Sequence, residues 1–238
     1  MEHVVVMGGS SGIGEATASL FGDRGARVTV VGRDRKKLAQ VADRITGEVT
    51  TRAVDASVPD EVTAFFAEVA EIDHLVVALS GAAGGGPFAS LDLAELQLGF
   101  EGKFWPHLRI LQAALPKLRR TGSVVLVTAA SARAALPGTA GLAAINGALE
   151  AVVGPLATEL APLRINAVSP GVIDTPWWDR VPAEQRTAVF EGIARTIPAG
   201  RVGRPEHVAE AIHLLATNPY VTGTVLEVAG GAHLATGR

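Results

Sequence analysis

Short apolar runs alternate along this chain with longer stretches in which apolar residues recur every three to four positions. Runs rich in β-branched residues predict strands at 4–7, 27–31, 49–54, 75–79, 123–128, 164–168 and 225–228. Helical spacing predicts helices at 34–45, 93–99, 103–119, 141–160 and 205–216. Because the strands are nearly continuous in apolar residues, we expect an α/β fold: a Rossmann-like, doubly wound parallel sheet of about seven strands with helices on both faces.

No linker, composition shift or internal repeat divides the 238 residues. This length suits one large α/β domain, so residues 1–238 are expected to form a single domain. Pro155 lies inside the helical pattern at 141–160 and has no N–H to donate, so we expect a kink there.

The first apolar run ends in a glycine-rich turn, Gly8 to Gly14, that leads into a helical pattern. Such a turn places bare backbone N–H groups at the positive end of a helix, where a pyrophosphate can approach without meeting a Cβ. Gly8 and Gly12 are expected to serve the tight turn and the close approach, and Gly14 the packing of helix on strand. A purely structural turn would look similar, but a strand before it and a helix after it favour nucleotide binding.

The second strand ends in Gly32-Arg33, about where an acidic residue would bind the ribose 2′-hydroxyl of NAD. An arginine can instead pair with a 2′-phosphate through charge-assisted hydrogen bonds. NADP(H) is therefore favoured over NAD(H). The alternative interpretation leaves Arg33 as an ordinary exposed arginine at a strand end.

Composition excludes several other classes of function. A net charge of −3 and no basic run give no electrostatic footprint for nucleic acid. The chain has no cysteine, and its six histidines lack metal-ligand spacing, so we expect no metal site and surface or capping roles for the histidines. No apolar run reaches about 18 residues and no charged leader precedes the first strand, so a cytoplasmic protein without a membrane partner is expected.

Across almost its whole length the chain resembles the short-chain dehydrogenase/reductase family. The residues that carry the resemblance are the glycine turn, Val54-Asp55, the segment 164–171 with Thr175, and the closing pairs Thr222-Gly223 and Gly230-Gly231. The resemblance implies that Asp55 holds the adenine amino group, and that Ile173 and Thr175 hold the nicotinamide carboxamide. It also implies a mobile substrate lid at about 174–200, beginning with Trp177 and Trp178, and a homo-oligomer, either dimer or tetramer. The expected cofactor-binding residues are Gly8, Ser10, Ser11, Gly12, Ile13, Gly14, Arg33, Asp55, Asn146, Pro170, Gly171, Ile173 and Thr175.

The same resemblance indicates that the family's usual catalytic residues are changed. The family's tyrosine, the lysine four residues later and the serine thirteen residues earlier fall on Leu142, Asn146 and Ala129, and its helical asparagine falls on Lys103. The chain's only tyrosine is Tyr220, just before the last strand. Carbonyl reduction needs a proton as well as a hydride, and loss of a positioned acid costs about 10²–10⁴-fold in rate.

Lys103, Ser131 and Asn146 are the remaining catalytic candidates. Lys103 restores the missing cation, or acts as an acid if burial lowers its pKa; alternatively its ammonium extends to solvent. Ser131 can hydrogen-bond a substrate oxygen, and Asn146 the nicotinamide ribose. Three functions stay open: an NADP(H)-dependent oxidoreductase for a small carbonyl or alcohol with altered proton transfer, a catalytically silent NADP(H)-binding regulator or sensor, and a structural subunit.

Overall fold

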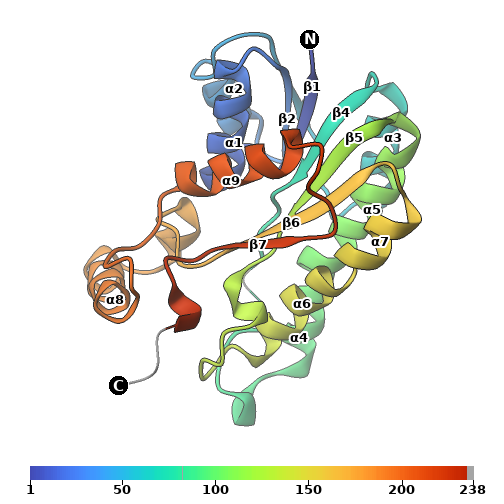
Figure 1. Cartoon of the computed structure of the whole chain (residues 1–238). Helices are drawn as coiled ribbons and strands as arrows, with labels where there is room; N and C mark the ends of the chain where they lie inside the picture. The colour runs from blue at the N-terminus through green and yellow to red at the C-terminus, as the bar shows by residue number, and fades with distance from the viewer. Residues whose placement is uncertain (82, 235–238) are drawn as a thin grey trace.

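The computed structural model describes residues 1–81 and 83–234, and within them seven parallel strands form one sheet (Figure 1). The strand order is β3-β2-β1-β4-β5-β6-β7, so the direction of winding reverses between β1 and β4. The predicted α/β fold with a doubly wound parallel sheet is confirmed; Ala82 and residues 235–238 lie outside the described residues. The strands are β1 (His3–Met7), β2 (Arg27–Gly32), β3 (Val49–Ala53), β4 (Ile72–Val77), β5 (Leu118–Val127), β6 (Arg164–Pro170) and β7 (Val225–Val228).

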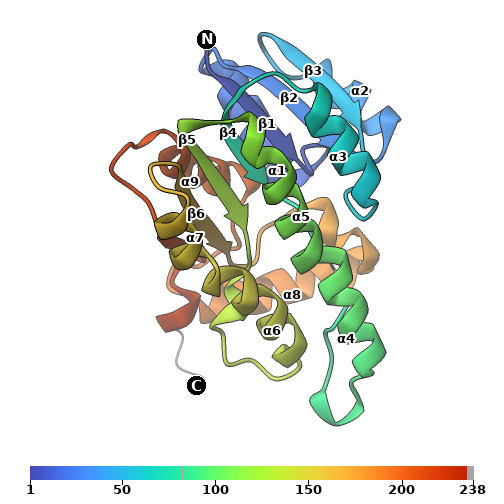
Figure 2. The same cartoon turned by 90° about the vertical axis from the view of Figure 1, so that its right-hand side faces the viewer.

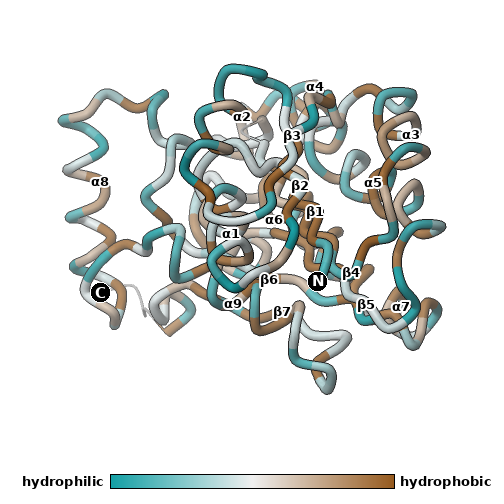
Figure 3. Tube along the Cα trace, turned by 90° about the horizontal axis from the view of Figure 1, so that it is seen from above, coloured by the Kyte–Doolittle hydropathy of each residue, from teal (hydrophilic) through white to brown (hydrophobic). Residues whose placement is uncertain are grey.

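Helices cover both faces of this sheet (Figures 1 and 2). One face carries α1 (Gly12–Asp23), α2 (Arg35–Ala42) and α9 (Pro205–Thr217), and the other carries α3 (Pro59–Glu68), α5 (Trp105–Ala114) and α7 (Val153–Glu159). Successive strand residues point to opposite faces: Val4 packs with Phe21 of α1, whereas Val5 belongs to the core cluster that contains Phe66 of α3. Figure 3 shows these strands as the hydrophobic centre of the molecule.

The remaining helices are α4 (Leu93–Gly99), α6 (Ala140–Ala151) and α8 (Ala183–Thr196). Helix α8 lies to one side of the sheet in Figures 1 and 3, and none of its side chains is buried. Residues 140–159 have the length and hydropathy of a membrane span. In the fold, however, this stretch is the helical pair α6 and α7, and its Ile145, Leu149 and Val153 are buried in the protein.

Two predicted boundaries are wrong for identifiable reasons. The helix expected at 103–119 ends at Ala114, because Pro116 cannot continue it and β5 already begins at Leu118. The strand expected at 75–79 lies at Ile72–Val77, since the polar Asp73 and His74 obscure its first half in the apolar pattern. The kink expected from Pro155 is confirmed. The helical stretch 141–160 is interrupted at Val152, one turn before Pro155, which has no N–H for the carbonyl of Ala151.

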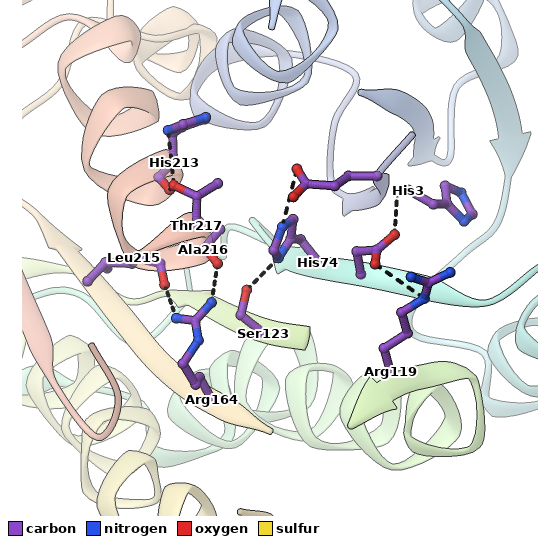
Figure 4. Close-up of polar contacts among 11 residues, drawn as sticks. His3, His74, Arg119, Ser123, Arg164, His213, Leu215, Ala216 and Thr217 are labelled. Atoms are coloured by element: carbon purple, nitrogen blue, oxygen red, sulfur yellow. Dashed lines mark hydrogen bonds and ion pairs between the residues drawn. The ribbon is translucent and has the colours of Figure 1, made fainter. Parts of the chain in front are cut away.

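The amino-terminal edge of the sheet holds buried polar side chains (Figure 4). His74 Nδ1 lies 2.8 Å from Ser123 Oγ, and the Arg164 guanidinium donates to the carbonyls of Leu215, at 2.8 Å, and Ala216 at the end of α9. Burial lowers the pKa of His74. The surface or capping role expected for the histidines is therefore wrong for His74.

Two further histidines, His3 and His107, are also buried. Each bonds within the fold, with His3 Nε2 at 2.9 Å from Thr29 Oγ1 and His107 Nδ1 at 2.8 Å from the carbonyl oxygen of Lys103. Both ring nitrogens of His3 have partners, because its Nδ1 lies 2.9 Å from the Glu71 carbonyl oxygen, whereas the buried His107 Nε2 has none among the described residues. The sequence pattern did not reveal that either ring is buried. By contrast, His207 does cap α9, as its Nδ1 accepts a hydrogen bond from the N–H of Arg204.

Candidate active site

The glycine turn joins β1 to α1 at the centre of the carboxyl-terminal edge of the sheet. Gly8 and Gly12 have φ values of 81° and 55°, which side chains with a Cβ seldom adopt. A Cβ on Gly14 would lie 2.2 Å from the carbonyl oxygen of Gly8, so the packing of α1 on β1 requires glycine here. The N-cap residue Ser11 makes no side-chain cap hydrogen bond, and the amides of Gly12, Ile13 and Gly14 have no acceptor within the helix. These N–H groups at a positive helix end form a cradle suited to an anion.

Arg33 and Asp55 follow β2 and β3 beside this cradle. The Asp55 carboxylate accepts hydrogen bonds from the hydroxyl and the N–H of Ser57 at 2.7 and 2.9 Å, which, with the nearby Arg33, lower the pKa of Asp55. Arg33 is exposed, and no other described side chain forms an ion pair or hydrogen bond with its guanidinium. Ser10 packs against Gly32, where a Cβ would lie 2.9 Å from Ser10 Oγ. A free guanidinium thus stands next to the glycine turn.

The loop after β6 approaches the same glycine turn from the half of the sheet that lies beyond β4. β6 ends at the buried Pro170, and the buried Ile173 forms an isolated parallel bridge with Gly203. Thr175 lies against the glycine turn, because a Cβ on Gly12 would be 3.2 Å from Thr175 Cβ. The fold therefore brings this loop and the glycine turn together, although more than 150 residues separate them in the sequence.

The segment predicted as a lid, about 174–200, contains a short 3₁₀ helix, Pro176–Arg180, and α8. Trp177 Nε1 donates a hydrogen bond of 3.2 Å to the carbonyl of Gly81, in the loop after β4. The Arg180 guanidinium carbon lies 3.5 Å from the centroid of the Trp177 ring, which is a cation–π contact. The segment spans from the loop after β6 to the loop after β4; its mobility stays a prediction.

Lys103 lies on one turn of π-helix, Phe100–Phe104, where α4 runs into α5. Pro106 has no N–H for the carbonyl of Gly102, which accounts for the widened turn. The Lys103 side chain is buried, and its Nζ donates to the Asn146 Oδ1 at 2.7 Å and to the Thr128 carbonyl at 3.1 Å. Burial lowers the pKa of Lys103 to about 8. The alternative in which this ammonium extends to solvent is wrong.

Asn146 connects the other two catalytic candidates, Lys103 and Ser131. Its Nδ2 donates to the carbonyl of Leu142 at 2.9 Å and to Ser131 Oγ at 3.2 Å, while its Oδ1 accepts from Lys103. Lys103, Asn146 and Ser131 therefore form one hydrogen-bonded chain. The Leu142 side chain, which has no proton to give, packs beside Gly85, where a Cβ would lie 3.6 Å from Leu142 Cδ1. A contact between Asn146 and a nicotinamide ribose stays a prediction.

Sequence reasoning missed Glu150. This residue lies one turn after Asn146 on α6; its Oε1 accepts from Thr128 Oγ1 at 3.0 Å, and its Oε2 pairs with Arg133 Nη2 at 3.0 Å. The signal that could have revealed it is the i, i+4 spacing from Asn146, which places both side chains on one face of the helix. Tyr220, by contrast, is 98% exposed in the loop before β7 and lies far along the chain from α6.

Comparisons with known proteins agree with this arrangement. Residues 8–233 match the family model described as enoyl-(acyl carrier protein) reductase. The chain is 31% identical to the 3-oxoacyl-acyl-carrier-protein reductase FabG of Thermotoga maritima, over 95% of this chain and 96% of that protein. It is 32% identical to the L-fucose dehydrogenase of Oryctolagus cuniculus, over 98% of this chain and 86% of that protein.

Among solved structures, a small-chain dehydrogenase in complex with NADPH has the same fold. It is 31% identical, with a TM-score of 0.86, and the match covers 98% of this chain and 99% of that one. The strand order, the glycine turn and these matches over nearly the full length lead to one conclusion. The chain belongs to the short-chain dehydrogenase/reductase family.

Proposed function

We propose that this protein is an NADP(H)-dependent oxidoreductase that acts on a small carbonyl or alcohol substrate and uses Lys103 as its proton donor in reduction. The observation that carries the proposal is the position of the buried Lys103 ammonium at the carboxyl-terminal edge of the sheet, hydrogen-bonded to Asn146. Family membership supports hydride transfer as the class of reaction.

The residues at the glycine turn fit a phosphorylated dinucleotide. The amides of Gly12 to Gly14 would bind the pyrophosphate, at a place where a Cβ on Gly14 would fill the packing space. Arg33 would pair with the 2′-phosphate, since its guanidinium is exposed and without a partner among the described side chains. Asp55 would hold the adenine, and Ile173 and Thr175 the nicotinamide carboxamide. When bound, NADPH supplies the hydride.

Within residues 1–81 and 83–234, two acceptors bind the Lys103 ammonium, which leaves one N–H group for a substrate. An ammonium carries three, and the acceptors on Thr128 and Asn146 use two of them. The third would donate to the carbonyl oxygen of the substrate, so that the proton moves from Nζ to the developing alkoxide and leaves a neutral amine. A pKa of about 8 suits this role, because an acid that titrates near the working pH transfers its proton most effectively.

The hydrogen bond between Lys103 and Asn146 gives the altered site a simple interpretation. By its resemblance to the family, the chain is expected to have Asn146 at the lysine position and Lys103 at the helical asparagine position. Here the two residue types are exchanged, and their side chains meet at 2.7 Å. The exchange keeps one cation and one amide in the same place, but the positive charge now comes from the π-helical turn between α4 and α5 and not from α6.

The proposal is tested by Lys103→Met, with Lys117→Met as a matched control near the opposite edge of the sheet. NADPH should raise the melting temperature of both variants and of the parent protein, because a ligand that binds only the native state stabilises it. NADPH oxidation at 340 nm, measured with a panel of aldehydes, quinones and diketones, should fall about 10²–10⁴-fold in Lys103→Met alone. Full turnover in Lys103→Met would refute the assignment of Lys103.

The absence of a tyrosine donor favours one alternative, a catalytically silent NADP(H)-binding regulator. Leu142 cannot donate a proton, and Tyr220 is almost fully exposed. A thermal shift with NADPH but no oxidation with any compound in the panel would support this alternative. No shift with NADPH, NADP⁺ or NADH would instead favour a structural subunit.

A further inference from the structure

The buried Lys103 ammonium faces a carboxylate with which it shares no direct hydrogen bond. The side chain of Glu150 is only 9% exposed, although it carries a charge. It lies on α6, one turn after Asn146, and hence on the helix face that is turned toward Lys103. A charged carboxylate is costly to bury without partners, so its contacts identify what it serves.

Thr128 connects the two charges. Its carbonyl oxygen accepts from Lys103 Nζ at 3.1 Å, and its hydroxyl lies 3.0 Å from Glu150 Oε1 and 3.1 Å from the carbonyl of Val168. Thr128 directly follows β5, and its N–H is fixed by a bond of 2.9 Å to that same carbonyl. Lys103 and Glu150 are thus held on either side of one rigid residue.

Arg133 occupies the other oxygen of the carboxylate. Its Nη2 lies 3.0 Å from Glu150 Oε2, and its side chain is 47% exposed. The Glu150 carboxylate therefore interacts with two cations, Arg133 on its solvent side and the buried Lys103 on the other. On the α5 side of Lys103, burial and the nearby ammonium lower the pKa of His107 to about 3, so this imidazole is neutral.

We propose that Glu150 is a positioning residue that sets the proton affinity of Lys103, and that Arg133 limits this effect by pairing with the same carboxylate. A catalytic role for this interaction rests on the proposed function, whereas the effect of Glu150 and Arg133 on Lys103 can be measured in the protein without substrate. Burial favours the neutral amine, and the negative charge of Glu150 opposes that preference. The opposing charges keep Lys103 able both to hold and to release a proton near neutral pH.

The proton affinity of Lys103 can be measured directly by NMR of protein labelled with ¹³C in lysine. The chain has only four lysines, and Lys→Arg variants at Lys36, Lys37 and Lys117 identify their signals, which leaves that of Lys103. The wild-type Lys103 midpoint is expected near 8. Glu150→Gln should lower the midpoint by about one pH unit, as expected on removal of a nearby opposite charge. Glu159→Gln, the same change at an exposed site on α7, should leave it unchanged.

The second variant changes the midpoint in the opposite direction. Arg133→Gln removes a cation from the carboxylate, so the Lys103 midpoint should rise, by about half a pH unit for a partly exposed charge. Glu150→Asp, which keeps the charge, should recover part of the wild-type value. A purely structural role for Glu150 and Arg133 does not predict opposite shifts from the two variants.

Two results would overturn the proposal. The first is a Lys103 midpoint in Glu150→Gln that equals the midpoint in Glu159→Gln. The second is a Lys103 midpoint in Arg133→Gln that is no higher than in wild type. The second stands even if Glu150→Gln fails to fold, because Arg133 is half exposed. The alkaline limb of NADPH-dependent reduction should move with the midpoint in each variant. Correct midpoint shifts without turnover would refute the proposed function and leave this inference standing; turnover with unmoved midpoints would do the reverse.

Discussion

Replacement of Lys103 by methionine is expected to change how the stability of the protein depends on alkaline pH. Burial lowers the pKa of Lys103 from 10.5 to about 8, and each pKa unit corresponds to about 1.4 kcal/mol, so the charged native form costs about 3 kcal/mol. Between pH 8 and 10.5 the unfolded chain still binds the proton that the native protein has released. The free energy of unfolding therefore rises with pH across this window, relative to a variant that has no group titrating there.

Urea unfolding of wild type and Lys103→Met, in matched buffers from pH 7 to pH 10.5, measures this contribution. The difference in unfolding free energy, wild type minus variant, should increase by about 3 kcal/mol across the series. Alkaline effects that the two proteins share cancel in the difference, and Lys117→Met controls for the replacement of a lysine elsewhere in the fold. A difference that stays constant from pH 7 to pH 10.5 would mean that the Lys103 ammonium is not desolvated, and the reasoning about its acidity would then fail.

Three other substitutions test the glycine turn and the buried polar contacts at the amino-terminal edge of the sheet. Gly14→Ala should destabilise the protein by about 1–3 kcal/mol and abolish the thermal shift with NADPH, since its Cβ would meet the Gly8 carbonyl at 2.2 Å; Gly147→Ala, on α6 with nothing within 4 Å, should be neutral or stabilising in the same melts. Between pH 7 and pH 5, the free energy of unfolding should fall less in His74→Gln than in wild type. Burial lowers the pKa of His74 in the native state, so in wild type the unfolded chain takes up a proton below about pH 6.5 that the native protein does not bind. An equal fall in the two proteins, measured by urea titration, would contradict this. Arg164→Met removes the guanidinium that donates to the carbonyls of Leu215 and Ala216 and should cost about 2–4 kcal/mol in the same assay. A cost below about 0.5 kcal/mol would show that water replaces the guanidinium.

The sequence predicted the sheet well because buried parallel strands leave continuous apolar runs. The glycine turn was equally legible, since strand, turn and helix are contiguous and the required φ values leave only glycine at Gly8 and Gly12. The pattern failed where polar residues are buried, as at His74 in β4, whose partner Ser123 is 49 residues away. A pattern of neighbouring residues cannot predict a hydrogen-bond partner that is so distant in the sequence.

The candidate site was predictable as a set of residues but not as a network. Resemblance to the family placed Lys103 and Asn146 at exchanged positions, yet only the fold shows that their side chains bond. Lys103 is buried on a π-helical turn before Pro106, and the regular helical periodicity of the sequence does not indicate such a turn. Glu150 escaped notice because a single glutamate on an apolar helix is typical of a solvated face.

The two regions that respond to pH lie at opposite ends of the strands. Buried His74 is at the amino-terminal edge, and Lys103 with Thr128 is at the carboxyl-terminal edge. Protonation of His74 in acid should therefore lower the free energy of unfolding, whereas deprotonation of Lys103 in base should remove the proposed proton donor without opposing the fold.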